Sequence, residues 1–369
     1  MKIIIATPLF PPEIESIATY AKELATRLKA THQVWILAYA GNWEEIPDLE
    51  IYSINKRQPI FFRLINYFIK LSHLAKQADI IYAQNALASG LPTIFVKIFF
   101  RKAVVINFFE DEALKRARHF SLTEKSWEQF LRKPEANFKI NLIRKLQIWV
   151  LRRADKVLVS SQALAEVLSK EYKLAKDKIV VNYPAPANTL QLPFALSEIK
   201  QQIFVEARLF SWSGIGEIIR AMDILKNKFA DLKLVIVGDG QEKNNLQNLV
   251  EELGLGAQVD FRGWVSKAER AYLLKSSQVL VYNPTSEDFS SAIVDYVVAN
   301  KPIVSINSAY AREIFAGSAV FVDFGKASEI AQAITKIFTS QQFVGANNQE
   351  NFSWARHISQ LEEIFDKML

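Results

Sequence analysis

The first stretch with a chemical signature is PLFPPEIESIATYAKELATRL, residues 8–28. It follows the apolar run KIIIA, which predicts a buried strand, and it continues into a segment with apolar or small residues at helical spacing. Many α/β proteins bind phosphate at such a strand–loop–helix unit, because the N–H groups of the helix N-terminus act as donors. Such loops usually contain glycine, whereas this one has prolines and the glutamates Glu13 and Glu15. The position is therefore typical of phosphate binding, but the loop is not.

Other kinds of chemistry are excluded by residue type and spacing. The chain has no cysteine, which excludes a disulfide framework, a thiolate metal site and a cysteine nucleophile. The four histidines, at positions 32, 73, 119 and 357, show no metal-ligand spacing. The VGDG turn at 237–240 ends a predicted strand but is not a G-x-G-x-x-G dinucleotide fingerprint.

The elements that would position a site are short apolar runs alternating with amphipathic segments. Strands are predicted at 2–6, 33–40, 79–84, 103–109, 156–161, 178–183, 202–209, 232–240, 259–265, 278–284, 302–307 and 319–324. Several runs are almost entirely apolar, as in strands buried on both faces, and the helices between them imply parallel crossovers. A length of 369 residues suits about two domains. We therefore predict an α/β protein with two Rossmann-like, doubly wound parallel-sheet units.

The boundary between these units is predicted in YPAPANTLQLPF, residues 183–194, which has three prolines and no helical period. We place the first domain at 1–188 and the second at 189–352. Ligands of such sheets bind beyond the carboxyl ends of the strands. A central cleft lined by loops of both domains is therefore expected.

The charge of the chain is uneven along its length. Residues 1–200 contain 29 Lys and Arg against 19 Asp and Glu, a balance of +10, whereas residues 201–369 have a balance of −4. A basic first half suits an anionic partner, either nucleic acid or an anionic membrane surface. The N-terminus does not resemble a signal peptide, and the longest apolar stretch, 91–109, is interrupted by Lys97, Arg101 and Lys102. We expect no transmembrane segment.

Eight motifs in order carry a family resemblance over nearly the whole chain. In the second half they are ARLFSWSGIGEIIRAMDIL, LVIVGDGQEKNNLQNLVEELGL, VDFRGWVSKAERAYLLKSS and NPTSEDFSSAIVDYVVANKPIVS. The first half adds PPEIESIATYAKELATRL, ADIIYAQNALASGLP and RRADKVLVSSQALAEVL, and FSWARHISQLEEIF ends the chain. Together they resemble the family-4 glycosyltransferases, which have the GT-B fold. The resemblance implies an acceptor-binding first domain, a nucleotide-sugar-binding second domain, and a C-terminal helix (353–369) that packs back on the first.

The resemblance implies three principal donor-site residues. Arg208 matches the arginine that binds the donor diphosphate, and its guanidinium offers a rigid fork of donors that suits phosphate. Glu287 matches the first glutamate of the family's E-x7-E motif, which hydrogen-bonds the donor sugar. The second position holds Asp295, one methylene shorter, which is expected to accept from a ribose hydroxyl. Helix capping and ordinary surface charge are the structural alternatives for both acids.

The chain also departs from the family pattern around the diphosphate. Ser213 stands where a lysine is usual, so a hydroxyl replaces a charge, although Gly214 still follows. The family's EGFG reads EDFS here, with Asp288 and Ser290 at glycine positions. The donor is expected to contact the following residues: Ser213, Gly214, Gly238, Asp288, Phe289, Ser290, Ser291 and Asp295.

Glu15 and Ser16 replace the two glycines that let backbone N–H groups approach the donor diphosphate in relatives. Glu15 brings a negative charge toward an anion. With Ser213, two diphosphate contacts are weakened in this divergent member. A catalytically degenerate protein therefore stays open as an alternative.

Polar residues in the first half mark the acceptor side. Asp111 aligns with the acid of a short acidic loop in relatives and is assigned a catalytic role beside Arg208 and Glu287. Gln84, Asn85 and Asn107 end or follow apolar runs and are candidates for the acceptor side, with loop capping as the alternative. The resemblance implies no metal ion and no resident cofactor, because protein charges neutralise the leaving diphosphate.

Two basic and aromatic segments, 57–70 and 138–153, suit an interfacial helix on an anionic membrane. The alternative for each is a core-facing helix with a solvated basic back. We expect such a membrane surface as a partner, and no nucleic acid. A cytoplasmic protein, peripheral on the inner face of the membrane, is expected.

The resemblance thus implies a retaining glycosyltransferase that moves a sugar from a nucleotide-diphosphate donor to a lipid-linked, polysaccharide or other glycan acceptor. The main alternative is a degenerate GT-B protein that binds a glycan, a lipid or a partner glycosyltransferase. A nucleotide-sugar epimerase, which also has two Rossmann-like domains, is a third hypothesis. Histidine-rich active loops typical of that class are not apparent.

Overall fold

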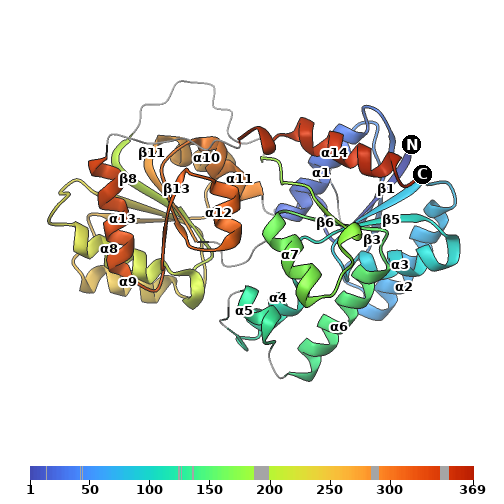
Figure 1. The fold of residues 1–369 in the computed structure, drawn as a ribbon, viewed down its shortest axis with the longest axis horizontal. Coiled ribbons are helices and arrows are strands. Elements are labelled where there is room, and N and C mark those ends of the chain that lie inside the picture. Colours follow the sequence, from blue (N-terminus) through green and yellow to red (C-terminus); the bar gives the residue numbers. More distant parts are fainter. Residues whose placement is uncertain are drawn as a thin grey trace. The chain divides into compact units, whose positions relative to one another are not determined.

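The computed structural model describes residues 1–13, 15–41, 43, 45–123, 125, 127–134, 137–186, 199–283, 291–340 and 349–369. These residues form two compact α/β units (Figure 1). The first unit contains Met1–Ala185 and Ser353–Leu369, and the second is built from residues between Pro186 and Phe352. The linker expected at 183–194 lies largely outside the described residues.

The first unit is a seven-stranded parallel sheet in the order β3-β2-β1-β4-β5-β6-β7. Its strands are β1 (Lys2–Thr7), β2 (Gln33–Tyr39), β3 (Glu50–Ile54), β4 (Ile80–Gln84), β5 (Ala103–Asn107), β6 (Lys156–Val159) and β7 (Ile179–Val181). Its helices are α1 (Ser16–Leu28), α2 (Ile60–Ala75), α3 (Gly90–Phe100), α4 (Glu112–His119), α5 (Trp127–Arg132), α6 (Phe138–Arg153), α7 (Gln162–Glu171) and α14 (Trp354–Asp366).

The second unit is a six-stranded parallel sheet in the order β10-β9-β8-β11-β12-β13. Its strands are β8 (Ile199–Glu206), β9 (Lys233–Val237), β10 (Val259–Gly263), β11 (Ser277–Tyr282), β12 (Ile303–Ile306) and β13 (Ala319–Val322). Its helices are α8 (Ile215–Leu225), α9 (Lys243–Glu252), α10 (Lys267–Ser276), α11 (Ser291–Ala299), α12 (Ala309–Phe315) and α13 (Ala327–Thr339). Short 3-10 turns lie at Lys176–Lys178, Ser211–Ser213 and Gln349–Asn351.

Both sheets confirm the predicted fold class, because every described strand pair is parallel and helices connect most consecutive strands. Strand β3 was not predicted from the sequence. Its residues EIYSI are exposed or half-buried, as at a sheet edge, so they lack the fully apolar run that marks the central strands.

Helix α14 belongs to the first unit, although it is last in the chain. Its side chains Leu361, Ile364 and Phe365 are buried in the cluster that also contains Ile3 and Leu24. Polar contacts add to this packing. The Gln360 side chain donates to the Val181 carbonyl at 2.6 Å, and that of Asn182 donates to the His357 carbonyl at 3.3 Å.

Candidate active site

The strand order of each sheet identifies where a ligand can enter. In the second unit the chain reverses direction across the sheet between β8 and β11, and in the first unit between β1 and β4. The carboxyl ends of the two strands at such a switch point leave a crevice between their loops. Arg208 and Asn283 follow β8 and β11 at the switch point of the second unit. In the first unit, residues 8–13 follow β1 and Gln84 ends β4.

Two glycines hold the loop that carries Arg208. Gly238 has φ +125°, and a Cβ there would lie 2.0 Å from the Ala207 carbonyl oxygen. A Cβ on Gly240 would lie 2.3 Å from the Leu209 carbonyl oxygen. Backbone hydrogen bonds reinforce this approach, since Leu209 N–H donates to the Asp239 carbonyl at 3.0 Å. The donor-site prediction for Gly238 stays a prediction, and the glycine has a packing role in positioning Arg208.

The turn after Arg208 is fixed from β11. The Asn283 side chain donates to the Ser213 carbonyl at 2.9 Å and lies against Gly214, whose φ is +71°. Ser213 itself is buried, and its hydroxyl accepts a long, 3.4 Å hydrogen bond from Ile215 N–H. The hydroxyl therefore faces the start of α8. Asn283 is a site-shaping residue that the motif analysis did not single out.

Arg208 lies two residues beyond the end of β8 and is exposed. Among the described residues, no carboxylate forms an ion pair with its guanidinium. A guanidinium forms its strongest hydrogen bonds with carboxylate and phosphate groups. The side chain is therefore available to a ligand with phosphate groups.

Asp295 has a partner that the sequence did not suggest. It is fully buried on α11, and its Oδ2 accepts from Arg270 Nη1 of α10 at 2.6 Å. Arg270 Nε also donates to Glu206 Oε2 of β8 at 2.7 Å. Burial acts to lower the pKa of Arg270, but the two carboxylates outweigh it and raise that pKa. The three side chains form an ionic triad at the carboxyl end of β8, in which Asp295 is fully buried and Glu206 is partly exposed.

Several predicted donor residues lie outside the described residues: Glu287, Asp288, Phe289 and Ser290. Ser291 opens α11, and nothing is described of its side chain. Their assignments stay predictions.

In the first unit, Glu15 and Ser16 stand at the exposed N-terminus of α1. Glu15 occupies the N-cap with extended backbone, and its side chain makes no capping hydrogen bond. Its charge reaches Lys115 of α4, which pairs with Glu110. Burial lowers the pKa of Lys115, but Glu110, Glu112 and Glu15 together raise it. The negative charge at the start of α1 is thus partly offset by a lysine of α4.

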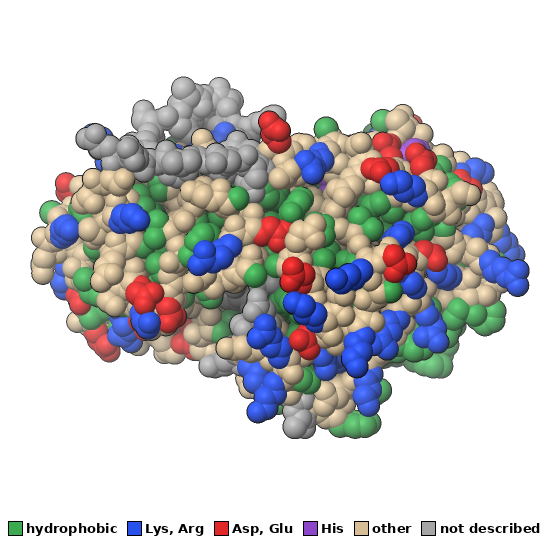
Figure 2. Space-filling model, in the orientation of Figure 1, with side chains coloured by type: hydrophobic (Ala, Val, Ile, Leu, Met, Phe, Trp, Pro, Cys, Tyr) green, Lys and Arg blue, Asp and Glu red, His purple; other side chains and the backbone are tan. Residues whose placement is uncertain are grey.

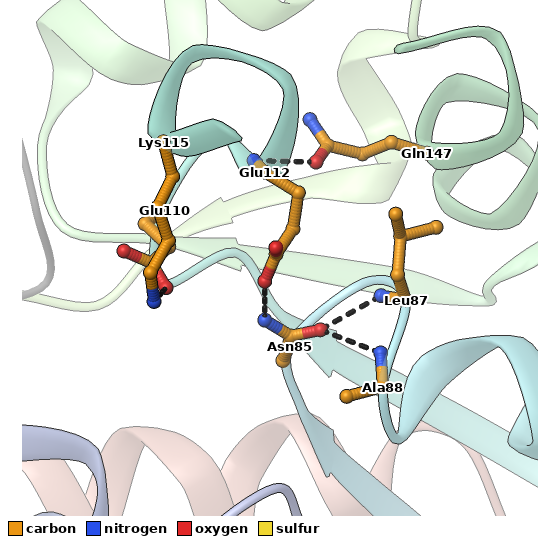
Figure 3. A network of polar contacts seen from close by, with 7 residues as sticks. All are labelled: Asn85, Leu87, Ala88, Glu110, Glu112, Lys115 and Gln147. Atoms are coloured by element: carbon orange, nitrogen blue, oxygen red, sulfur yellow. Dashed lines mark hydrogen bonds and ion pairs between the residues drawn. The ribbon is translucent and has the colours of Figure 1, made fainter. Parts of the chain in front are cut away.

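Asn85 organises the loop between β4 and α3 (Figure 3). Its Oδ1 accepts from Leu87 N–H and Ala88 N–H, each at 2.8 Å, and its Nδ2 donates to Glu112. Its φ is +130°, a conformation that the two backbone hydrogen bonds support. Gly90 allows this turn, because a Cβ there would lie 2.7 Å from the Asn85 carbonyl oxygen.

Asp111 is the N-cap of α4 and is buried. Its Oδ1 accepts from Leu114 N–H at 2.8 Å, while its Oδ2 accepts from the Tyr172 hydroxyl and from Gln147 Nε2, the latter at 3.1 Å. Burial raises the pKa of Asp111, and these hydrogen bonds oppose the rise. The carboxylate is thus engaged by protein donors, as the capping alternative anticipates. Its catalytic assignment stays a prediction.

Gln84 and Asn107 lie side by side at the carboxyl ends of β4 and β5, in register with each other. Both are fully buried. No polar atom of either side-chain amide has a hydrogen-bond partner of good geometry among the described residues, although Asn107 lies close to the Tyr82 hydroxyl. An unsatisfied buried amide is costly, so this layer has capacity for further hydrogen bonds. The structure brings together these two acceptor-side candidates.

A chain of buried groups continues from this layer to α14. The Tyr82 hydroxyl lies 3.0 Å from that of Tyr20, which lies 2.7 Å from His357 Nε2. The other ring nitrogen, Nδ1, is 2.8 Å from the Tyr183 carbonyl and therefore carries the proton. Burial lowers the pKa of His357 to about 4, although the Tyr183 carbonyl favours the charged form. This histidine is neutral and structural.

Among the described residues, no cluster of His, Asp and Glu has the geometry of a metal site. In the same described ranges, no helix is both long enough and apolar enough to cross a bilayer.

Two doubly wound parallel sheets, each with polar groups at its switch point, define a two-unit Rossmann-like protein. The sequence profile described as "Glycosyltransferase Family 4" matches residues 17–185, and that described as "Glycosyl transferases group 1" matches residues 193–354. The chain therefore belongs to the family-4 glycosyltransferases of the GT-B fold.

Individual relatives are distant. The chain is 23% identical over 347 residues to "Alpha-monoglucosyldiacylglycerol synthase" of Streptococcus pneumoniae. The matched region covers 85% of this chain and 73% of that protein. It is 22% identical over 191 residues to "Lipopolysaccharide core biosynthesis glycosyltransferase LpsE" of Rhizobium meliloti, covering 50% of this chain and 54% of the relative. This chain thus spans only about half of several relatives.

Solved structures share the fold. Anabaena Alr3699/HepE in complex with UDP has a TM-score of 0.74 at 17% identity, with all of both chains covered. Sucrose-phosphate synthase from Thermosynechococcus elongatus has a TM-score of 0.72 at 14% identity, covering 99% of this chain and 98% of that one.

Proposed function

We propose that this glycosyltransferase transfers a hexose, with retention of the anomeric configuration, from a nucleotide-diphosphate donor to a lipid-linked or polysaccharide acceptor of the cell envelope. The observation that carries the proposal is Arg208. It is an exposed guanidinium at the β8/β11 switch point, held there by the close approach of Gly238 and Gly240 to its loop.

The donor class is supported by chemistry and by likeness. A guanidinium suits a diphosphate, and developing charge on the leaving diphosphate is what a preorganised cation stabilises. HepE, which shares the fold, was solved with UDP and with UDP-glucose. We therefore propose a UDP-sugar as the first donor to test, with Arg208 neutralising the leaving group and Glu287 orienting the sugar. No metal ion is required in this scheme.

The reaction itself is positioning plus charge stabilisation. The acceptor oxygen forms a bond to the anomeric carbon on the face from which the diphosphate leaves, and the bond between that carbon and the phosphate oxygen breaks. The proton of the acceptor hydroxyl passes to the β-phosphate of the leaving nucleoside diphosphate. We expect the acceptor to bind to the first unit, where Gln84 and Asn107 form a polar layer at the carboxyl ends of β4 and β5. A lipid-linked acceptor is favoured by the name of the S. pneumoniae relative, and peripheral membrane association follows from it.

The catalytically degenerate alternative is favoured by one specific observation. Asp295, the expected ribose-binding carboxylate, is fully buried and paired with Arg270. The expected ribose contact is thus engaged within the protein, and the changes at Glu15 and Ser213 leave Arg208 as the main expected diphosphate contact. A protein that binds a nucleotide sugar or a glycan without turnover would retain the same fold.

A thermal-shift screen against UDP-, GDP-, ADP- and dTDP-sugars identifies the donor class, because a ligand that binds the native state raises its apparent stability. We expect UDP-sugars to raise the unfolding temperature of the parent and to have no effect on Arg208→Ala. The matched control is Arg220→Ala, an exposed arginine on α8 in the same unit. If Arg208→Ala binds the donor as tightly as the parent, the site is misplaced.

Release of UDP in the presence of envelope lipid extract then separates the two functions. Turnover supports the transferase, whereas binding without hydrolysis or transfer supports the degenerate alternative.

A further inference from the structure

The outer faces of α2 and α3 expose an unusual amount of apolar surface. On α2 the exposed side chains are Phe61, Phe62, Ile65 and Ile69, and on α3 they include Ile98 and Phe99. Phe61 and Phe99 are 67% and 69% exposed, which is high for the largest apolar residues. The two helices pack together, and Phe68 of α2 meets Phe99 at 6.1 Å between ring centroids. The surface is therefore continuous, and a continuous exposed apolar surface marks an interaction site.

The charged side chains on the helices of this surface have one sign. Neither α2, α3 nor the neighbouring α6 contains a single Asp or Glu. Each of the three helices carries cationic side chains, and α3 packs against both of the others. Figure 2 shows basic and hydrophobic side chains side by side at the lower right, over the region where Figure 1 labels these helices. A surface of this composition is complementary to an anionic, amphipathic partner.

The structure shows that the cations beside the apolar face are not simply those of the 57–70 segment. Arg63 and Lys70 of α2 lie over the rings of Tyr39 and Tyr52, at 5.1 and 4.2 Å from the centroids, on the β3 side of the helix. The cations on the α3 side come instead from Arg101, the C-cap of α3, and from Arg153, the last residue of α6. This arrangement joins segments that are about fifty residues apart, so the sequence did not indicate it.

These cations line a cavity of about 590 Å³ beside Ile98. Its lining includes Lys97, Arg101, Lys102 and Arg153, with one acid, Asp155. Asp155 is already engaged, since it pairs with Lys97 and accepts from Val104 N–H at 2.9 Å. Arg153 is held over the Trp149 ring at 4.1 Å, and Lys102 donates to the Ala78 carbonyl at 2.7 Å. The cavity thus offers a net positive, partly ordered set of donors, which suits a phosphate group.

We propose that the α2–α3 face docks on an anionic phospholipid bilayer and that the Lys97–Arg101–Arg153 cavity receives a lipid phosphate. Ile98 borders the cavity, so a phosphate bound there would have its acyl region next to the exposed apolar stripe. Aromatic and aliphatic side chains would enter the interface while the cations stay at head-group depth. This inference does not depend on the transfer reaction.

The test is co-sedimentation with vesicles of phosphatidylcholine alone and of phosphatidylcholine with phosphatidylglycerol. We expect binding to the anionic vesicles, weakened by salt, and little binding to the neutral ones. The double variant Arg101→Asn/Arg153→Gln is expected to lower anionic binding by roughly tenfold or more, because each cation near an anionic surface contributes to the attraction. Asparagine suits position 101, where φ is +52°. Phe61→Ser/Phe99→Ser is expected to lower binding without changing its salt dependence.

The matched control is Lys170→Gln, which removes an exposed cation from α7 of the same unit. Its binding is expected to equal that of the parent. The proposal is overturned by equal binding to both vesicle types, by binding to neither, or by a loss in Lys170→Gln as large as in the double variant. Unfolding temperatures and UDP-glucose binding, both measured without vesicles, show that each variant is folded and report on the donor site separately.

Discussion

At the scale of single residues, the position of Arg208 depends on glycine. Gly238 combines a left-handed φ of +125° with a contact to the Ala207 carbonyl that leaves no room for a side chain. A side chain at position 238 would therefore be unfavourable for two reasons. An L-residue is strained at this φ, and its Cβ would collide with a backbone carbonyl, which cannot move aside as a flexible side chain can. The loop that presents the guanidinium therefore cannot relax around a substitution.

We expect Gly238→Ala to lower the free energy of unfolding of the second unit by roughly 2 kcal/mol or more. Gly254→Ala is the matched control, since Gly254 has φ +65° but no heavy atom within 4 Å of the point that an alanine Cβ would occupy. It should cost only the backbone strain, about 1 kcal/mol. Urea unfolding measures both, and equal costs would show that the Ala207 contact is unimportant.

Glu15 and Ser16 are a second residue-scale case. The N-terminus of α1 is exposed, and Glu15 does not use it as a capping site. Its carboxylate is instead close enough to Lys115 to raise that lysine's pKa. A phosphate that approached these N–H groups would meet a negative charge and two side chains.

Replacing Glu15 and Ser16 by glycine is therefore expected to tighten UDP-sugar binding several-fold, with a stability cost of about 1 kcal/mol from added chain entropy. Calorimetric titration measures the affinity. Glu23→Gln, which removes a charge further along α1, is the control and should leave affinity unchanged. If the glycines have no effect, the loop does not meet the phosphates, and Glu15 faces an acceptor or another chain instead.

At the scale of elements, the Glu206–Arg270–Asp295 triad ties β8, α10 and α11 together beneath the donor-side loops. Arg270 is only 13% exposed, and Asp295 is 1% exposed. Removing one member of such a set leaves a buried charge without its partner. Loss of one triad member is therefore expected to lower stability more than loss of a surface ion pair does.

Arg270→Met is expected to destabilise the second unit by roughly 3–5 kcal/mol. Arg262→Met, which breaks a half-exposed pair with Asp260 on β10, should cost less than about 1 kcal/mol. Adding Glu206→Gln and Asp295→Asn to Arg270→Met should recover part of the loss, because no buried charge then remains. A full loss in the triple variant would contradict an electrostatic role for the triad. Chemical denaturation measures all three.

The elements also show what a sequence can predict. Central strands such as β4 and β11 were predicted because burial on both faces makes them apolar throughout, and β3 was missed because an edge strand does not have that pattern. Arg208 could be placed because one strand end positions it. Asp295 pairs with Arg270, and Asp111 accepts a hydrogen bond from Gln147. Each partner lies on another helix, and tertiary packing brings that helix close. No local spacing encodes such contacts.

At the scale of the whole molecule, the first unit is closed by the last helix of the chain. His357 of α14 is buried between the Tyr20 hydroxyl and the Tyr183 carbonyl, and its pKa is lowered to about 4 from a usual value near 6.5. Burial of a neutral ring is the cause. Trp354 of the same helix stacks on Tyr20 and lies under Arg27. Protonation of the His357 ring would therefore weaken the packing of α14 on the rest of the first unit.

The direction of the pKa shift of His357 determines how the stability of the first unit depends on pH. Because the folded pKa lies below the unfolded one, the contribution of His357 is complete above about pH 6.5 and declines as the pH falls toward 4. Between pH 7 and pH 5 the unfolded state binds the proton and the native state does not, which costs the first unit about 2 kcal/mol. Calorimetry of the intact chain should show two transitions, since two units with separate cores unfold separately. The transition of the first unit should move to lower temperature over this range.

His357→Gln isolates the effect, because every other titrating group, including Asp111 with its raised pKa, is retained. The variant is expected to be less stable at pH 7, having lost the ring contacts, but to lose about 2 kcal/mol less than the parent between pH 7 and pH 5. His119→Gln, an exposed histidine at the end of α4, is the control and should follow the parent at both pH values. If His357→Gln and the parent show the same pH dependence, His357 takes up its proton without opening the contact between α14 and the sheet. The acid sensitivity of the first unit would then have to come from its carboxylates.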